Sequence, residues 1–288
     1  MTRPIALANA KSGNGSADPE LEQWCARLGI DLRDIGDDLE AALEKAAAED
    51  VPFVAVVGGD GTQRTAARIF AERGVTMLPV PGGTRNHFAK ALGLSDLDVA
   101  ATAVESGSSR DIPLADLNGE TFVNTAVIGW YPEMVRTRER LRTRLPRPVA
   151  AMVAFARHIG RMFPFEVELA GERHRAWMLW VGNGRFGLDP GELAERDDVT
   201  EQVLDVRVAL ADKKFPRTRV LWDLVRRRLA DSDHLERFVA AGPVTARLHG
   251  THVAAALDAE VVDITTPLVF TPAANHVRVL AAAPPAAT

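Results

Sequence analysis

Residues 58–62, Gly-Gly-Asp-Gly-Thr, have the composition of a phosphate-binding turn. They follow an apolar run at 53–57 that is typical of a buried strand, and they precede a stretch rich in Ala, Arg, Ile and Phe that is typical of a helix. Such a turn presents backbone N–H groups and a helix N-terminus to an anion, and its glycines remove side chains that would block close approach. Asp60 places a carboxylate beside this candidate site, where it could act on a metal-bound phosphate. Taken alone, the pattern also fits a simple strand-to-helix turn.

Two further polar glycine loops occur in the first third of the chain. The loop at 9–15 contains candidate contacts for a phosphate or ribose: Asn9, Ser12 and Gly13. The loop at 81–90 contains another set: Gly83, Thr84 and Asn86. Thr84 and Asn86 stand at an expected helix start, where a simple helix cap is the alternative interpretation. Three such loops, each after a strand, favour a ligand site over three unrelated turns.

The elements expected around these loops alternate between strand and helix. Apolar runs predict strands at 4–8, 30–35, 53–57 and 77–79. Stretches rich in Ala, Glu, Leu and Arg predict helices at 18–27, 39–49, 62–73 and 86–92. This alternation predicts an α/β domain with a mostly parallel sheet, in which ligands bind beyond the carboxyl ends of the strands. We therefore expect the three loops to converge on one crevice.

After about residue 112 the chain consists of short β-rich segments separated by turns. The expected strands lie at 121–128, 165–169, 176–181, 204–210, 244–248, 253–257, 261–265 and 277–280. Helical insertions are expected at 146–162 and 217–230. This pattern is typical of a β-sandwich or a barrel-like domain. The predicted organisation is an α/β domain at 1–112, an all-β sandwich domain with helical insertions at 113–281, and a flexible tail at 282–288.

Composition excludes several classes of protein. The chain has 288 residues, and its net charge of −5 argues against nucleic-acid binding. A single cysteine, Cys25, rules out an internal disulfide framework, and no Cys/His cluster has zinc spacing. There is no P-loop motif, and the Gly-x-Gly-x-x-Gly at 182–187 lacks a convincing following helix. With too short an apolar N-terminus for a signal peptide and no apolar run near the ~18 residues of a membrane span, we expect a cytoplasmic protein.

The three loops together resemble a known family. Asn-x-x-Ser-Gly-x-Gly, then Gly-Gly-Asp-Gly-Thr, then Pro-x-Gly-Thr-x-Asn-x-Phe-Ala-Lys, in this order, resemble the diacylglycerol kinase catalytic-domain family. That family includes bacterial diacylglycerol kinases, related bacterial lipid kinases, and the sphingosine and ceramide kinases. The resemblance extends over nearly the whole chain through shorter matches at 111–113, 122–124, 181–184, 204–206 and 257–260.

The resemblance implies a two-domain fold with the active site in the cleft between an α/β nucleotide domain, related to that of NAD kinases, and a β-sandwich. It also implies transfer of the ATP γ-phosphate to a lipid hydroxyl, with Mg²⁺. The implied nucleotide contacts are Asn9, Ser12, Gly13, Gly59, Asp60, Gly61, Thr62, Gly83, Thr84 and Asn86. Asp60 would act on the metal indirectly, through water or phosphate. Asp258 would be the general base on the acceptor hydroxyl, with Glu260 beside it.

Some residues depart from the family pattern. His87 stands where the family usually has an Asp in the acidic network around the metal, and 63–65 read Gln-Arg-Thr where a leucine-asparagine-glutamate sequence is common. Ala259 replaces a glycine, and at a positive φ this costs on the order of 1 kcal/mol. The family's structural metal sits near an Asp-Asp-Gly-Leu-Leu-Asp stretch. The nearest match, at 197–205, is longer and lacks the glycine, so the sequence gives little support for that metal.

A lipid acceptor requires an apolar binding surface for its acyl chains. Candidates for an acyl-chain pocket, most of them expected in the core, are Trp130, Tyr131, Met134, Phe155, Met162, Phe163 and Phe165. Basic stretches at 136–147 and 213–228 suit an anionic membrane, although solvated helix faces are an equally good interpretation. We expect transient, peripheral contact with the inner membrane face, and we leave a homodimer open.

Two alternatives to a lipid kinase stay open. The first is a kinase of a soluble hydroxyl compound such as NAD, because NAD kinases share Gly-Gly-Asp-Gly. The second is a nucleotide- or lipid-binding regulator with weak or no kinase activity, for which His87 is the main support. The loop at 81–90 and the Asp-x-Glu at 258–260 favour the lipid kinase.

Overall fold

The computed structural model describes residues 2–9, 18–83, 86–159, 163–187, 196, 198–211 and 235–281. It divides into two compact units. Unit 1 comprises the chain up to Leu114 and the segment from Asn275 onward, and unit 2 comprises Ala115–Ala274. From the sequence, residues 275–281 were predicted to belong to the second domain. The strands β5 and β15 each continue from one unit into the other.

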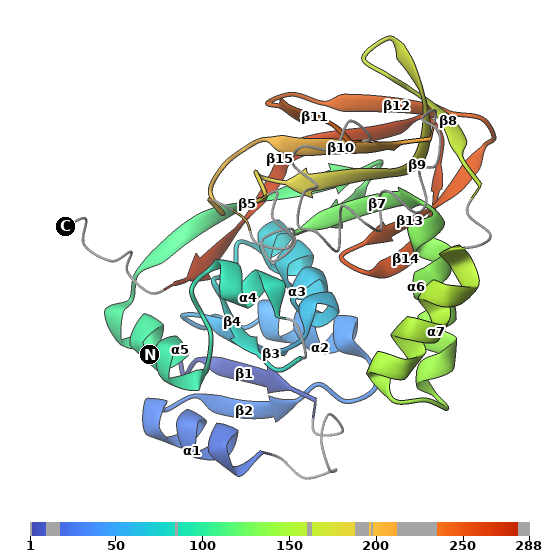
Figure 1. Cartoon of the computed structure of the whole chain (residues 1–288). Coiled ribbons are helices and arrows are strands. Elements are labelled where there is room, and N and C mark those ends of the chain that lie inside the picture. The colour runs from blue at the N-terminus through green and yellow to red at the C-terminus, as the bar shows by residue number, and fades with distance from the viewer. Residues whose placement is uncertain are drawn as a thin grey trace. The chain divides into compact units, whose positions relative to one another are not determined.

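Unit 1 is an α/β unit, as the alternation of strands and helices predicts. Its elements are β1 (Ile5–Ala8), α1 (Pro19–Leu28), β2 (Asp31–Asp34), α2 (Leu39–Ala47), β3 (Val54–Gly58), α3 (Asp60–Arg73), β4 (Met77–Pro81), α4 (His87–Ala91), α5 (Leu97–Ser106) and most of β5 (Ser109–Leu117). The strands run parallel in the order β4-β3-β1-β2 and are buried through β1, β3 and β4 (Figure 1). Because β1, β3 and β4 are parallel neighbours, the loops that follow them leave the same edge of the sheet.

The helices of unit 1 begin and end where local chemistry favours it. Asp18 and Asp38 accept backbone N–H bonds as the N-caps of α1 and α2, and Gly29 ends α1 in the left-handed conformation. α3 begins at Asp60, two residues before the predicted start, because Gly59 takes the N-cap position. The helix α5 was not predicted from the sequence.

Unit 2 is rich in strands, and a helical hairpin interrupts it. Its elements are β6 (Glu120–Phe122), β7 (Thr125–Gly129), α6 (Trp130–Arg142), α7 (Arg147–Ile159), β8 (Phe165–Leu169), β9 (Glu172–Asn183), β10 (Leu204–Leu210), β11 (Leu235–Ala240), β12 (Val244–Leu248), β13 (His252–Leu257), β14 (Glu260–Thr265) and the first part of β15 (Leu268–Leu280). The strands pair mainly antiparallel, in the order β14-β13-β7-β9-β8-β12-β15, and β10 pairs with β9 and β11. The predicted helix at 217–230 and the tail at 282–288 lie outside the described residues.

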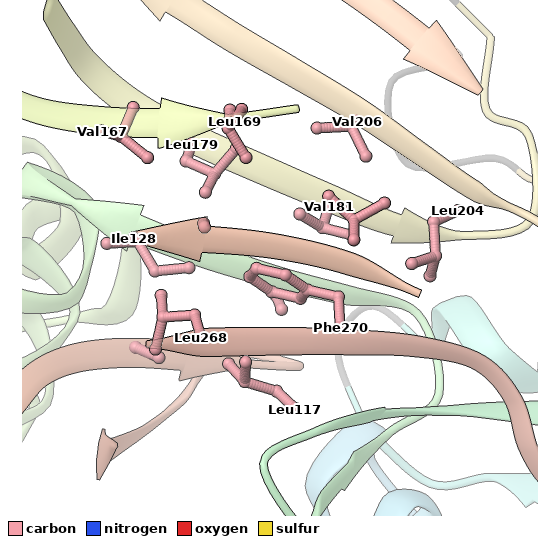
Figure 2. Close-up of a cluster of buried hydrophobic side chains, with 14 of the residues drawn as sticks. Leu117, Ile128, Val167, Leu169, Leu179, Val181, Leu204, Val206, Leu268 and Phe270 are labelled. Carbon is pink, nitrogen blue, oxygen red and sulfur yellow. The ribbon is translucent and has the colours of Figure 1, made fainter. Parts of the chain in front are cut away.

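The core of unit 2 consists of aliphatic side chains contributed by strands far apart in the sequence. Figure 2 shows Leu179, Val181 and Val206 on one side of this cluster and Leu268 and Phe270 on the other. All five are at most 1% exposed. This confirms a mixed α/β fold with a strand-rich C-terminal part, and burial on this scale is the main contribution to its stability.

Candidate active site

The second and third glycine loops pack directly against each other at the ends of β3 and β4. The backbone N–H of Gly82 donates to the carbonyl of Gly58 at 3.1 Å. A Cβ added to Gly83 would lie 2.6 Å from the Cα of Gly59, and one added to Gly82 would lie 2.9 Å from the nitrogen of Gly58. At positions 82 and 83, only glycine fits this contact without backbone movement. The paired loops therefore present peptide groups at the edge of the sheet where α3 begins.

The N-terminus of α3 has the features of an anion site. Its N-cap, Gly59, has extended backbone angles and makes no side-chain capping bond. Asp60, Gly61 and Thr62 therefore form the first helical turn, where N–H groups have no partner within the helix. The side chain of Thr62 lies over Gly58, since a Cβ there would be 2.7 Å from the Thr62 Cβ. The helix dipole adds to the attraction for an anion at this end.

Asp60 links the start of α3 to the start of α4. Its Oδ1 accepts a hydrogen bond of 3.2 Å from the backbone N–H of Phe88, and the residue is half-buried. His87, which replaces the family's usual Asp, is the first residue of α4, so it lies next to this bond in the chain. One carboxylate thus stands among the glycine loops.

Asn86 holds the third loop closed instead of capping α4. Its Oδ1 accepts from the N–H of Gly83 at 2.8 Å, and its Nδ2 donates to the carbonyl of Gly83 at 2.9 Å. Asn86 has a φ of 53°, a left-handed value that asparagine tolerates better than most residues, and it makes no side-chain cap bond. Asn86 therefore occupies the N-cap position of α4 without capping the helix through its side chain, and its amide positions the glycines instead.

The structural role of Gln63 was not inferred from the sequence, in which the residue stood out only as a departure from the family pattern. Gln63 is 1% exposed, and its Nε2 donates to the carbonyls of Val56 at 2.8 Å and Val80 at 3.0 Å. One amide therefore ties β3 to β4 directly below the two packed loops. The available signal was a polar residue on the same helical face as Ala66, Ala67 and Phe70.

Of the first loop, only Asn9 is described, and it is exposed directly after β1. Since β1 lies next to β3, Asn9 and the loop at 58–62 leave the same edge of the sheet. Ser12, Gly13 and Thr84 lie outside the described residues.

In unit 2, Asp258 lies on a tight turn between β13 and β14. Its Oδ2 accepts from the N–H of Val123 at 2.7 Å, and its Oδ1 accepts from Asn124 at 2.8 Å and Thr125 at 2.9 Å. Only 8% of Asp258 is exposed. Charged acceptors form strong hydrogen bonds with backbone N–H groups, so these donors fix the orientation of the carboxylate.

Asp258 and Ala259 form the two central residues of this turn, and Glu260 follows them at the start of β14. Asp258 and Ala259 have φ values of 48° and 71°, and Leu257 pairs with Glu260 across the turn, as in a type I′ hairpin. Glu260 is exposed, whereas Asp258 is buried. Ala259 thus has the positive φ at which a glycine is favoured.

The peptide group between Val123 and Asn124 is also held at its carbonyl, the side opposite the N–H that Asp258 binds. Its carbonyl accepts from Asn183 Nδ2 at 2.9 Å and from a guanidinium nitrogen of Arg196 at 3.2 Å. Burial lowers the pKa of Arg196 to about 10, and the nearby charge of Asp258 opposes this shift. The matches at 122–124, 181–184 and 257–260 therefore meet around one peptide group. Neither the Asp258 contacts nor Arg196 could be read from the sequence.

Asp205, at the end of the stretch compared with the family's structural-metal motif, is fully buried and ion-paired. Arg207 and Arg237 each donate to its Oδ2, at 2.7 and 2.8 Å. Burial alone would raise the pKa of Asp205, but the hydrogen bonds and charges of the two arginines outweigh it and lower the pKa. Asp197 lies outside the described residues. In the part of the chain that is described, no group of three or more His, Cys, Asp or Glu side chains could hold a metal ion.

Comparison with known proteins agrees with these features. The family model for the diacylglycerol kinase catalytic domain matches residues 3–117. The diacylglycerol kinase of Mycobacterium tuberculosis is 30% identical over 236 residues, which is 75% of each chain. A probable lipid kinase YegS-like protein of Pseudomonas aeruginosa is 30% identical over 180 residues. The chain spans 59% of the length of that relative.

Solved structures show the same fold. A putative diacylglycerol kinase from Bacillus anthracis superposes with a TM-score of 0.71 at 18% identity, covering 97% of each chain. An NAD kinase from Archaeoglobus fulgidus superposes with a TM-score of 0.52 at 12% identity, covering 96% of this chain and 93% of its own. By sequence and by fold, the chain belongs to the diacylglycerol kinase catalytic-domain family.

Proposed function

We propose that this protein is an ATP- and Mg²⁺-dependent lipid kinase that transfers the γ-phosphate of ATP to the hydroxyl of a diacylglycerol-like lipid. The observation that carries the proposal is the contact between the two glycine loops beside the uncapped N-terminus of α3. Kinase relatives support a kinase, and the lipid kinases among them favour a lipid acceptor.

In this proposal unit 1 binds the nucleotide. The first turn of α3, at 60–62, would donate N–H groups to phosphate oxygens, and the Gly59–Gly83 contact would let the phosphates approach the backbone. Asn86 and Gln63 would keep the loops in place before the nucleotide arrives. Asn9, with Ser12, Gly13 and Thr84, would complete the nucleotide contacts. Such positioning is most of what phosphoryl transfer requires from a protein.

Asp60 is suited to help hold Mg²⁺. This ion commonly takes one or two carboxylates together with substrate phosphates and water, so a single half-buried carboxylate among phosphate-binding loops fits it. When bound, Mg²⁺ neutralises charge on the β- and γ-phosphates. Because Asp60 also accepts from Phe88, we expect its contact to the ion to pass through water or phosphate.

Unit 2 would supply the acceptor side. We propose that Asp258 accepts the proton of the lipid hydroxyl and that Glu260 lies beside the acceptor. The three N–H donors fix the orientation of the Asp258 carboxylate, and the exposure of Glu260 makes it accessible to a substrate. A positioned base contributes about 10²–10⁴-fold to the rate of such reactions.

The structure contains no helix, among its described residues, that is long and apolar enough to span a bilayer. A kinase of this kind would act from the cytoplasm and would contact the inner membrane face transiently to reach its lipid.

A regulator with little kinase activity is the second candidate, favoured by His87 at the start of α4. A histidine cannot supply the negative charge that an Asp would add near Asp60 at neutral pH. The substitution His87→Asp tests whether this departure limits catalysis. A large gain in rate would mean that His87 limits catalysis, and an unchanged rate would mean that Asp60 suffices.

The test is transfer of labelled phosphate from ATP, with Mg²⁺, to a panel of diacylglycerol, ceramide, sphingosine, undecaprenol and NAD. The proposal predicts labelled lipid and no labelled NAD. Label on NAD alone would identify a kinase of a soluble compound. Clear ATP binding without transfer to any acceptor would identify the regulator.

A further inference from the structure

The outward face of α7 carries apolar side chains that nothing in the described chain covers. Val149 is 37% exposed and Met152 is 65% exposed. Ala156, one turn further on, is exposed as well, so the three residues form a stripe at helical spacing. Ala150 and Ala154, on the other side of the helix, are buried, and α7 lies beside α6 (Figure 1).

An exposed aromatic residue follows this helix. Phe163 is 82% exposed, which is unusual for a phenylalanine in a folded domain. Single exposed apolar residues need no explanation, but a methionine, a valine and a phenylalanine on and after one helix form a candidate contact surface.

The same segment is strongly basic on an acidic protein. Residues 130–163 contain eight arginines and two glutamates, whereas the whole chain has a net charge of −5. Arg136, Arg138 and Arg142 pair with Glu133, Glu139 or Asp263.

The structure records no acidic partner, within its described residues, for three other arginines: Arg140, Arg144 and Arg157. Arg140 and Arg144 are exposed at the closed end of the α6–α7 hairpin, close in the chain to the start of α7 and to Val149. Positive charge without a recorded acidic partner therefore lies close in the chain to the apolar stripe.

We propose that Val149, Met152 and Phe163, with Arg140, Arg144 and Arg157, form a docking face for an anionic lipid bilayer surface. A helix with an exposed apolar stripe and flanking arginines binds the interface by burying the stripe and by attracting anionic headgroups. This face includes none of the residues proposed for phosphate transfer, and its binding does not depend on nucleotide or on catalysis.

A second copy of the chain is a poorer occupant. A symmetric dimer through this face would bring the same unpaired arginines together and would be opposed by like charges. Three exposed apolar side chains also fall short of the roughly 800 Å² per partner that stable interfaces bury. An anionic lipid surface can bury the apolar stripe and neutralise the positive charge of the arginines.

Co-sedimentation with vesicles tests the proposal, with no ATP present. We expect the protein to bind phosphatidylglycerol-containing vesicles, to bind pure phosphatidylcholine vesicles much less, and to be released by salt. Met152→Glu should weaken binding to anionic vesicles at least tenfold. Arg140→Ser with Arg144→Ser should weaken it about 25-fold, since one near-surface charge corresponds to about fivefold.

Matched control variants distinguish the contribution of this face to vesicle binding from the effects of net charge and of unfolding. Val239, 39% exposed on β11, provides Val239→Glu as a control for Met152→Glu. Arg27→Ser with Arg173→Ser removes the same charge from exposed sites elsewhere. Controls that lose as much binding as the test variants would overturn the proposal. So would equal binding to neutral and anionic vesicles, no binding at all, or a wild-type dimer that Met152→Glu dissociates in size-exclusion chromatography. Failure of the lipid kinase assay would leave these results unchanged.

Discussion

Replacing Gly83 by alanine should push the second and third glycine loops apart. The new Cβ would lie 2.6 Å from the Cα of Gly59 and 3.0 Å from Oδ1 of Asn86. Carbon atoms pack at about 3.5–4.0 Å, so one backbone must move by about 1 Å. Neither contact is the far end of a long side chain, and the movement must therefore disturb the loop.

Overpacking of this kind costs about 1–3 kcal/mol. At about 2–4 °C per kcal/mol for a protein of this size, a cost of about 2 kcal/mol lowers the thermal midpoint by roughly 4–8 °C. The same movement separates the backbone groups proposed to bind phosphate. We therefore expect ATP affinity to fall at least tenfold.

Two glycines provide matched controls. A Cβ on Gly59 would be 3.6 Å from the Cα of Gly83, an ordinary contact, so Gly59→Ala should change stability by less than about 1 kcal/mol. Gly242 has no atom within 4 Å of an added Cβ, and Gly242→Ala should be neutral for both stability and ATP binding. Thermal unfolding and calorimetric titration with ATP measure the two effects. If Gly83→Ala matched the wild type in both, the packed-loop account would be refuted.

Two further substitutions, at Ala259 and Asp205 of unit 2, should change the stability of the protein. Ala259→Gly should stabilise the protein by about 1 kcal/mol, because Ala259 has a φ of 71°, and a lower thermal midpoint would contradict this. Asp205→Asn should cost about 3–5 kcal/mol at neutral pH, since it leaves Arg207 and Arg237 without their carboxylate. Because the pKa of Asp205 is lowered on folding, its contribution is present above the unfolded pKa of about 3.9 and is lost as the pH falls through the folded value. Urea unfolding measures the free energy of unfolding of the wild type and of Asp205→Asn at a series of pH values. The difference between the two should become smaller below about pH 4, and a difference that stays constant with pH would count against the ion pair.

Much of the fold could be predicted because the strands of this chain are strongly apolar and bounded by turns. β10 and β12 coincide with the predicted ranges 204–210 and 244–248. The helix α6 was missed because its arginines and Trp-Tyr-Pro start hide the apolar periodicity, and β11 was missed because its side chains are mostly exposed. The single strand predicted at 121–128 is broken at 123–124, where the backbone N–H groups bond to Asp258 instead of to a strand.

In the candidate site, too, some features could be predicted from the sequence and others could not. Glycine turns after parallel strands could be placed together from topology alone. The tie between Asn86 and Gly83, the bridge from Gln63 to Val56 and Val80, and the anchoring of Asp258 could not. Each depends on a side chain meeting a backbone group through the folded geometry. Residue types and spacing do not determine such contacts.

The most direct test of the proposed phosphoryl transfer compares the wild type with Asp258→Asn and Glu260→Gln. Labelled lipid phosphate is measured at saturating ATP and Mg²⁺, together with ATP affinity as a readout of folded unit 1. The account predicts that Asp258→Asn lowers the transfer rate by at least 100-fold with ATP affinity within about twofold of the wild type, and that Glu260→Gln lowers the rate by less than tenfold. Undiminished transfer by Asp258→Asn would contradict it.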